Sequence, residues 1–284
     1  MKFVEHIRHC NRYDLSDFVP FHVGEARVGY IRRAFSMELI RFGTLFHVFE
    51  DLVHLDPRLT TAEARTDAVG EALAKLSEEG LLPGSDGEMY SVMAKFNGES
   101  LFEIDRPYCT SFGIINRGFH LNGLVGRGAE AKMWIARRSM TKKRHPGLLD
   151  NMVAGGHPSG LSPQENLEKE CAEEAGLSRE QARRAVSVGP ISYCMEVERG
   201  LRRHTFWCYD LELGEAELPT PTDGEVESFT LMAPEEIARQ IEETDGFKYN
   251  SALVIIDWLL RTGRITPEHP DYLEIAQGLR GGVL

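Results

Sequence analysis

The sequence predicts an α/β (α+β) protein, with a mixed β-sheet sandwiched between helices and a smaller α+β domain before it. Two observations support this fold class. After about residue 115, segments rich in aromatic and β-branched residues recur, as is typical of strands. Two segments with helical character, 163–175 and 250–262, interrupt them. The chain has 284 residues, which is too long for one domain of ~100–200 residues and long enough for two.

Residues 1–112 are interpreted as an N-terminal α+β domain of unknown role. The clearest helix in this region is 61–80, because a threonine can cap its start, apolar residues recur at helical spacing and Gly80 ends it. No motif with a known mechanism lies in this region. Strands are expected at 22–31, at 88–94 and in parts of 101–116.

Residues 113–264 are interpreted as a second domain, and 265–284 as a C-terminal tail packed on the body. The helix at 250–262 is mostly apolar, so we expect it to pack against the sheet. The strands of this sheet are expected at 121–126, 131–138, 185–197, 203–213 and 226–232.

Composition limits the class of protein. A hydrophobic content of 42% and a charged content of 27% are ordinary for a globular protein with a core. The formal net charge of −12 argues against a nucleic-acid partner. No apolar run of ~18 residues is present, so no membrane partner is expected. The five cysteines are widely spaced without a CxxC pair, and no signal peptide is seen, so a reduced, cytoplasmic protein is expected.

The most informative stretch is 155–178, GGHPSGLSPQENLEKECAEEAGLS. Ser162 can cap a helix whose first position is a proline, and Glu165 completes a capping box. Gly176 stands where a C-cap glycine is expected. The helix is therefore predicted to span 163–175.

Three acidic residues of this helix, Glu170, Glu173 and Glu174, fall in one arc at i+3 and i+4 spacing, beside an apolar stripe. Like charges at this spacing destabilise a helix by ~0.2–0.5 kcal/mol per pair. No Lys or Arg follows any of the three by four residues. A Mg²⁺ ion would neutralise them, because it prefers oxygen ligands. From spacing alone, a metal site and a solvated acidic face both remain open.

This stretch resembles the Nudix box, G-x5-E-x7-R-E-U-x-E-E-x-G-U, where U is aliphatic. Gly155 opens the box, and KECAEEAGL (169–177) closes it in register. The core Glu-x-x-Glu-Glu-x-Gly is intact. Leu161 stands where the family usually has Glu, which removes an accessory acid, and Lys169 stands where the family has Arg.

The resemblance implies a Nudix fold and roles for particular residues. Glu170, Glu173 and Glu174 would hold Mg²⁺, or Mn²⁺ in its place, helped by a loop carbonyl at Ala154 or Gly155. Lys169 would replace an arginine that orients a carboxylate, with the same charge but without the bidentate fork.

A more specific resemblance covers nearly the whole chain. It is to a Nudix subgroup, related to thiamine pyrophosphokinase proteins, in which a domain of unknown role precedes the Nudix domain. Members act on thiamine diphosphate and especially on its damaged oxo or oxy forms, which implies release of the monophosphate and phosphate here. The segments that carry it are PFHVGEARVGYI, FGIINRGFHLNGLVG, KMWIARRSMTKKRHPGLLDNMVAGGHPSG, TDGEVESFTLM and FKYNSALVIIDWLLRTG.

Hydrolysis of a diphosphate also needs a general base. The segment DGEVE (223–227) is the obvious second source of carboxylates, and Glu227 is preferred slightly over Glu225. If the segment is extended, both fall on one face. An acidic turn beside a strand is the alternative.

Basic residues are needed for the phosphates. Strand alternation sends Arg137 and Arg138 to opposite faces, and Arg138 with Lys142 could grip the phosphate tail. A solvated basic loop explains them equally well. The glycine-rich loop, with Gly155 and Gly156, would also line the substrate site.

Several further residues have a structural explanation beside a functional one. His120 and Asn122 are candidates for contact with the organic half of the substrate, but a structural turn is favoured. His157 is expected to be exposed. The three tryptophans are expected to be core residues.

Two other functions remain open. In the same fold, the enzyme could cleave another nucleoside diphosphate-linked compound, such as ADP-ribose or a dinucleotide. The chain could also be a Nudix-fold binding module without turnover, although all three carboxylates remain. The N-terminal domain could supply part of the substrate pocket, the surface of a homodimer, or neither.

Overall fold

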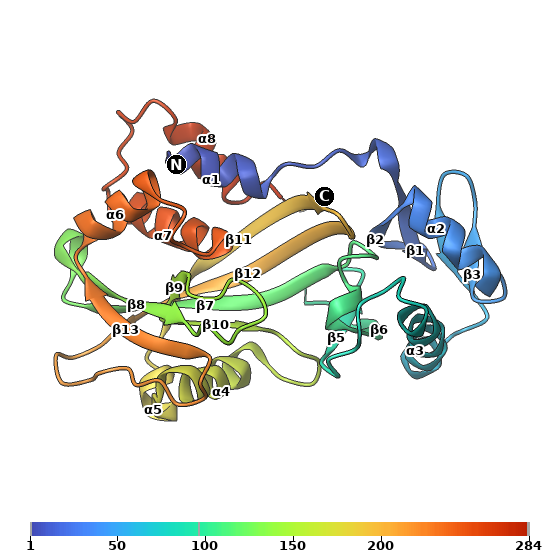
Figure 1. Cartoon of the computed structure of the whole chain (residues 1–284), viewed down its shortest axis with the longest axis horizontal. Helices are drawn as coiled ribbons and strands as arrows, with labels where there is room; N and C mark the ends of the chain where they lie inside the picture. The colour runs from blue at the N-terminus through green and yellow to red at the C-terminus, as the bar shows by residue number, and fades with distance from the viewer. Residues whose placement is uncertain (1, 96, 283–284) are drawn as a thin grey trace.

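The computed structural model describes residues 2–95 and 97–282. A large β-sheet lies between two layers of helices, and a smaller sheet with its own helices lies at one end of it (Figure 1). This arrangement confirms the predicted mixed α/β architecture.

The smaller sheet has the strand order β2-β1-β4-β3. One strand was expected at 22–31, and this prediction is wrong, because Val23 pairs with Ala26 and the chain turns back between them. Gly24 permits the turn with a φ of +56°. The strands are β1 (Phe18–Val23), β2 (Ala26–Arg32), β3 (Phe46–Val48) and β4 (Val53–Leu55), and β5 (Met89–Met93) pairs separately with β6 (Ser100–Asp105).

Helices pack against these strands to make the core of the N-terminal region. The helix predicted at 61–80 is confirmed, since α3 spans Ala62–Glu78 and the Thr61 hydroxyl accepts a hydrogen bond of 3.2 Å from the Ala64 N–H. Phe21, Leu76 and Phe102 are fully buried in this core. The other helical segments are α2 (Arg33–Leu39) and the 3₁₀ turns η1 (Leu15–Asp17), η2 (Ile40–Phe42) and η3 (Arg106–Tyr108).

The large sheet has the order β11-β12-β7-β8-β13, with β10 paired to β7 and β9 paired to β8. β12 and β7 run parallel while the other pairs are antiparallel, so the sheet is mixed, as predicted. Its strands are β7 (Ile115–Val125), β8 (Lys132–Arg138), β9 (Leu149–Asn151), β10 (Val153–Gly156), β11 (Val186–Val197), β12 (Gly200–Glu212) and β13 (Val226–Met232).

Helices cover both faces of this sheet (Figure 1). On one face, the apolar stripe of α4 is buried against strand residues such as Phe119 and Leu211. On the other face, α7 lies almost entirely buried, with Trp258 at its centre. The helical segments are α4 (Pro163–Ala175), α5 (Arg179–Ala182), α6 (Pro234–Glu243), α7 (Tyr249–Arg261), α8 (Tyr272–Gly278) and η4 (Gly128–Glu130).

The first helix, α1 (Phe3–Cys10), packs on the second face of the large sheet and not on the smaller one (Figure 1). Its Val4 and Ile7 join the core that contains α7. From α8, Ile275 enters the same core. The two ends of the described chain therefore share one core, and the domain boundary placed near residue 112 stays a prediction.

Two expectations from composition can be compared with the structure. All five cysteines are buried and free, which agrees with the expected reduced state of the protein. Within the described residues, no helix has the length and apolar character needed to cross a membrane.

Candidate functional site

The acidic helix α4 begins and ends as the sequence predicts. The Ser162 hydroxyl accepts from the Glu165 N–H at 3.2 Å, and the Glu165 carboxylate accepts from the Ser162 N–H at 2.9 Å, which completes the capping box. Gly176 ends the helix with a φ of +63°, a left-handed conformation that favours glycine. These two ends place the acidic arc along one edge of the helix, beside its buried stripe.

Glu174 is the most buried of the three predicted metal ligands, with 9% of its surface exposed. Its Oε2 accepts a hydrogen bond of 3.0 Å from the backbone N–H of Ala154 on β10. Burial, with a smaller contribution from the nearby carboxylates of Asp150 and Glu170, raises the pKa of Glu174 to about 8. Lys248 lowers this pKa by less than burial raises it, so the charged form of Glu174 is disfavoured.

Lys169 joins the other two carboxylates. Its Nζ donates to Glu170 Oε1 at 3.0 Å and to Glu173 Oε2 at 2.7 Å. The positive charge that offsets these two carboxylates therefore comes from Lys169, which precedes them, although no Lys or Arg follows them by four residues. Glu170 is mostly buried, and burial raises its pKa, whereas half of the Glu173 side chain is exposed. The predicted orienting role of Lys169 stays a prediction, and this bridge supports it.

The glycine-rich strand β10 packs tightly against the helix. A Cβ added to Gly155 would lie 2.8 Å from Glu170 Cγ, so only glycine lets the strand and this carboxylate come so close. Ala154, Gly155 and Glu170 thus form one packed unit. That Ala154 binds metal and that Gly155 and Gly156 bind substrate remain predictions.

Asp150 on β9 is a buried carboxylate that the sequence did not single out. Its Oδ2 accepts from Arg138 Nη1 and from Lys248 Nζ, both at 3.0 Å, and its Oδ1 accepts from the Ser251 hydroxyl. Burial alone would raise the pKa of Asp150, but Lys248, His120, Ser251 and Arg138 outweigh burial and lower it below its ordinary value. Two cations are therefore held next to the acidic helix.

A small cavity lies between the acidic helix and these cations. Glu225, of the predicted second acidic segment, lines it, and its carboxylate pairs with Lys142. Glu227, which the sequence favoured, is exposed at an irregularity of β13 between Val226 and Ser228, and its role as a base stays a prediction. The cavity is lined by Ala136, Arg138, Asp150, Asn151, Glu174, Glu225 and Val226.

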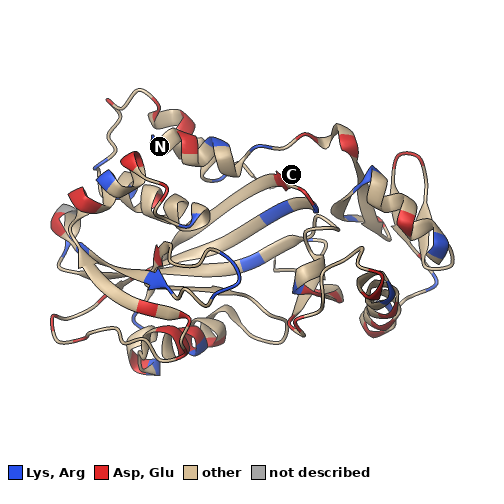
Figure 2. Ribbon diagram, viewed as in Figure 1, with Lys and Arg blue, Asp and Glu red and all other residues tan. Residues whose placement is uncertain are grey.

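Arg138 and Lys142, predicted to bind phosphate, therefore both lie at this site. Figure 2 shows the basic segments of the loop after β8 in front of the sheet, and acidic segments along α4. As alternation predicts, Arg137 points elsewhere and donates to the Gly147 carbonyl at 2.8 Å.

His120 and Asn122 do not form the turn that the sequence favoured, because both lie buried in the middle of β7. His120 Nδ1 donates to Asn151 Oδ1 and Asn151 Nδ2 donates to Asn122 Oδ1, each at 2.8 Å. Burial lowers the pKa of His120 to about 4, so the ring is neutral. This network fixes Asn151 directly beside Asp150.

His157 is also placed differently from its prediction, since only 5% of it is exposed. Its ring lies 5.3 Å from that of Trp207. Trp258 is buried as predicted, while Trp134 and Trp207 are half-buried beside the core.

The residues present fit a hard divalent cation. In residues 2–95 and 97–282, no three His, Cys, Asp or Glu side chains already surround one point. The side-chain donors here are carboxylate oxygens, which Mg²⁺ and Mn²⁺ prefer. Burial, and to a lesser extent the neighbouring carboxylates, raises the pKa values of Glu170 and Glu174, so a cation bound beside them would favour their charged forms.

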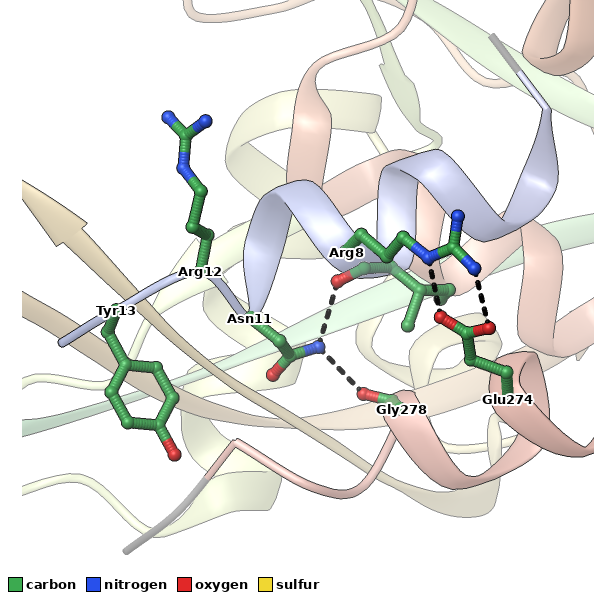
Figure 3. Close-up of a pocket in the computed structure, with 7 residues that line it drawn as sticks. Arg8, Asn11, Arg12, Tyr13, Glu274 and Gly278 are labelled. Atoms are coloured by element: carbon green, nitrogen blue, oxygen red, sulfur yellow. Dashed lines mark hydrogen bonds and ion pairs between the residues drawn. The ribbon is translucent and has the colours of Figure 1, made fainter.

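A larger hollow of about 490 Å³ lies apart from the predicted metal and phosphate site, between α1 and α8 (Figure 3). There Arg8 donates to Glu274 at 2.6 Å, and Asn11 donates to the Gly278 carbonyl at 3.0 Å. These contacts tie the two ends of the chain together. The hollow contains neither of the two cation partners of Asp150 nor any of the α4 carboxylates.

Two family models match this chain. A domain of unknown function, DUF4743, matches residues 2–116, and the NUDIX domain matches residues 123–252. The second match contains the acidic helix, Asp150 and Lys248.

Relatives match over most of the chain. Nudix hydrolase 24, chloroplastic, from Arabidopsis thaliana is 41% identical over 99% of this chain and 78% of its own length. Nudix hydrolase 20, chloroplastic, from the same plant is 42% identical over 98% and 77%. An uncharacterized protein of Saccharomyces cerevisiae is 33% identical over 80% and 73%. The expected cytoplasmic location is wrong on this comparison, because both plant relatives are named as chloroplastic proteins.

Solved structures also align with part of the chain. DR0079 from Deinococcus radiodurans has 20% identity and a TM-score of 0.44, over 59% of this chain and 97% of that one. The NUDIX domain of Shewanella oneidensis NrtR, complexed with ADP ribose, has 10% identity and a TM-score of 0.41, over 53% and 90%.

Proposed function

Since the chain belongs to the Nudix hydrolase family, which acts on diphosphate bonds, we propose that it is a Mg²⁺-dependent pyrophosphohydrolase of thiamine diphosphate. Damaged oxo or oxy forms of thiamine diphosphate are included as substrates, and Mn²⁺ could replace Mg²⁺. The products are the monophosphate and phosphate.

One observation carries the proposal most directly. Glu174 is buried beside Glu170 and within the influence of Asp150, and it is tied to the Ala154 N–H. A buried carboxylate that adds nothing to function would be costly, because burial without a partner charge disfavours its charged form. A bound metal ion would stabilise the charged form of this carboxylate and so explains its position.

In this proposal Glu170, Glu173, Glu174 and the Ala154 carbonyl hold the metal. When bound, the metal supplies Lewis acidity toward the phosphoryl oxygens. Lys169 keeps Glu170 and Glu173 together through its two hydrogen bonds.

Arg138 and Lys248 bind the phosphate oxygens. Asp150 holds both cations at 3.0 Å, so their charges are already in place before the substrate arrives. Water attacks the terminal phosphorus, the bond from that phosphorus to the bridging oxygen breaks, and the monophosphate leaves. Glu225, or Glu227 in the alternative, accepts the proton of the attacking water.

The organic half of the substrate is placed beside Tyr249, which directly follows Lys248. Its ring lies 5.4 Å from that of His145 in the loop after β8, and Arg202 donates to its hydroxyl at 3.1 Å. Tyr249 is half-buried, so an aromatic ring could stack beside it. This supports a heteroaromatic substrate, and the resemblance of segments such as KMWIARR to the thiamine-related subgroup favours thiamine.

A panel of substrates tests the proposal. Phosphate release is measured with thiamine diphosphate, its oxo and oxy forms, and ADP-ribose coupled to a phosphatase, each with and without Mg²⁺. We expect Mg²⁺-dependent release from the thiamine compounds. Release from ADP-ribose alone would overturn the proposed substrate, and binding of thiamine diphosphate without any turnover would indicate a binding module.

A further inference from the structure

The N-terminal region touches the glycine-rich segment that precedes the acidic helix. β5 lies at the end of the large sheet that faces the smaller sheet (Figure 1). The Ser159 N–H donates to the Met89 carbonyl at 2.8 Å, and the hydroxyls of Ser91 and Ser159 lie 2.9 Å apart. A strand from outside the NUDIX match is therefore bonded to the loop of the predicted metal site.

Tyr90 of β5 occupies the space beside Gly156. Tyr90 is 5% exposed. A Cβ added to Gly156 would overlap the Tyr90 hydroxyl oxygen and lie 3.0 Å from Cζ. Since real side chains cannot approach so closely, Gly156 must be glycine as long as Tyr90 occupies this place.

Two adjacent glycines thus make room for different partners. The space at Gly155 is taken by Glu170 of α4, and the space at Gly156 is taken by Tyr90 of β5. Ala154, the preceding residue, donates to Glu174. The short strand β10 is therefore held between the predicted metal carboxylates and the N-terminal domain.

We propose that the N-terminal domain positions the metal site, and that Tyr90 is the positioning residue that sets the place of β10. Tyr90 acts through Gly156 and the strand, and it touches neither metal nor substrate. This inference rests on the proposed function, because it assigns a role to the N-terminal domain in the same hydrolase. It requires that changes at Tyr90 alter the binding of metal.

Mn²⁺ binding to the full chain, measured by titration calorimetry or electron paramagnetic resonance, gives a readout that does not need turnover. We expect Gly156→Ala to weaken binding about tenfold, as changes around metal ligands commonly do. Adding Tyr90→Phe to this variant removes the overlapping oxygen, and we expect it to recover most of the loss. The apparent affinity for Mg²⁺ in turnover should follow the same order.

Tyr90→Ala keeps the glycine and removes the support from the other side, and we expect it to weaken Mn²⁺ binding about tenfold as well. Tyr108→Ala is the matched control, because Tyr108 is buried to the same extent in the same N-terminal core. It should lower stability without changing Mn²⁺ affinity. Thermal unfolding of every variant confirms that it is folded.

Mn²⁺ affinity of Gly156→Ala and Tyr90→Ala within twofold of the parent would overturn the inference, and so would a double variant no better than Gly156→Ala. A failure of the proposed function would give a different set of Mn²⁺ affinities. In that case the parent and Glu174→Gln would bind Mn²⁺ equally poorly, which would overturn both proposals together.

Discussion

The carboxylate of Glu174 accepts a hydrogen bond of 3.0 Å from the backbone N–H of Ala154, which joins the acidic helix to the glycine-rich strand 20 residues earlier. This bond keeps the carboxylate buried beside Asp150 and Glu170, where its charged form is disfavoured. The burial of this carboxylate, which supports a metal site, therefore lowers the free energy of unfolding of the metal-free protein.

Glu174→Gln should stabilise the metal-free protein. The amide has no charge, and its oxygen can still accept from the Ala154 N–H. Because burial raises the pKa of Glu174 to about 8, we expect the free energy of unfolding at pH 7 to rise by about 1–3 kcal/mol. Chemical denaturation in the presence of a chelator measures this free energy. A variant less stable than the parent would show that the Glu174 carboxylate does not destabilise the metal-free protein.

Asp150→Asn should be strongly destabilising, because Asp150 is buried and its loss leaves Arg138 and Lys248, each with only 16% of the side chain exposed, without their counter-charge. Breaking a buried ion pair in this way typically costs about 3–5 kcal/mol. Asp17→Asn is the matched control, since the Asp17 carboxylate pairs with Arg32 at 2.6 Å but is half-exposed, and its loss should cost less than about 1 kcal/mol. Urea denaturation compares the two, and equal costs would contradict the account of Asp150.

If Asp150→Asn folds at low temperature, its kinetics add a second test. Asp150 holds the two cations that are proposed to bind phosphate, so we expect KM to rise. A variant with an unchanged KM would show that the positions of Arg138 and Lys248 do not matter for binding.

His204 should make stability depend on pH. It is half-buried in β12, its Nε2 accepts from Asn116 at 3.1 Å, and desolvation lowers its pKa to about 3. The unfolded chain takes up the proton near pH 6.5 while the folded protein does not, so this contribution is complete above pH 6.5 and is lost as the pH falls toward 3.

Comparison with His204→Gln isolates this effect from other titrating groups. Between pH 6.5 and 4.5 we expect the parent to lose about 2 kcal/mol more free energy of unfolding than the variant. Urea denaturation across this range measures the difference. Parallel pH profiles of the two proteins would mean that His204 is charged in the folded state or accessible to water.

Structural features that depend on residues close together in the sequence could be predicted from the sequence. Ser162, Glu165 and Gly176 defined both ends of α4, because caps depend on residues only a few positions apart. The mixed sheet with helices on both faces followed from strand composition and from two clear helices.

Features set by distant contacts could not be predicted in this way. Asp150 and Lys248 are 98 residues apart in sequence, and Tyr90 meets Gly156 from a different region of the chain. Glu225 and Glu227 are both exposed, but only Glu225 lines the cavity, and β13 is irregular between Val226 and Ser228, so simple alternation does not hold there. Such irregularities depend on the partner strand and are not visible in one segment.

The most direct test of the central claim is phosphate release from thiamine diphosphate by the parent and by Glu174→Gln, as Mg²⁺ is titrated. We expect phosphate release by the parent to depend on Mg²⁺, and we expect the variant, although folded, to lose at least about 100-fold in rate, because a metal ligand is lost from a charge-stabilising site. A variant that retains the rate and the Mg²⁺ dependence of the parent would contradict the assignment of the acidic helix as the metal site.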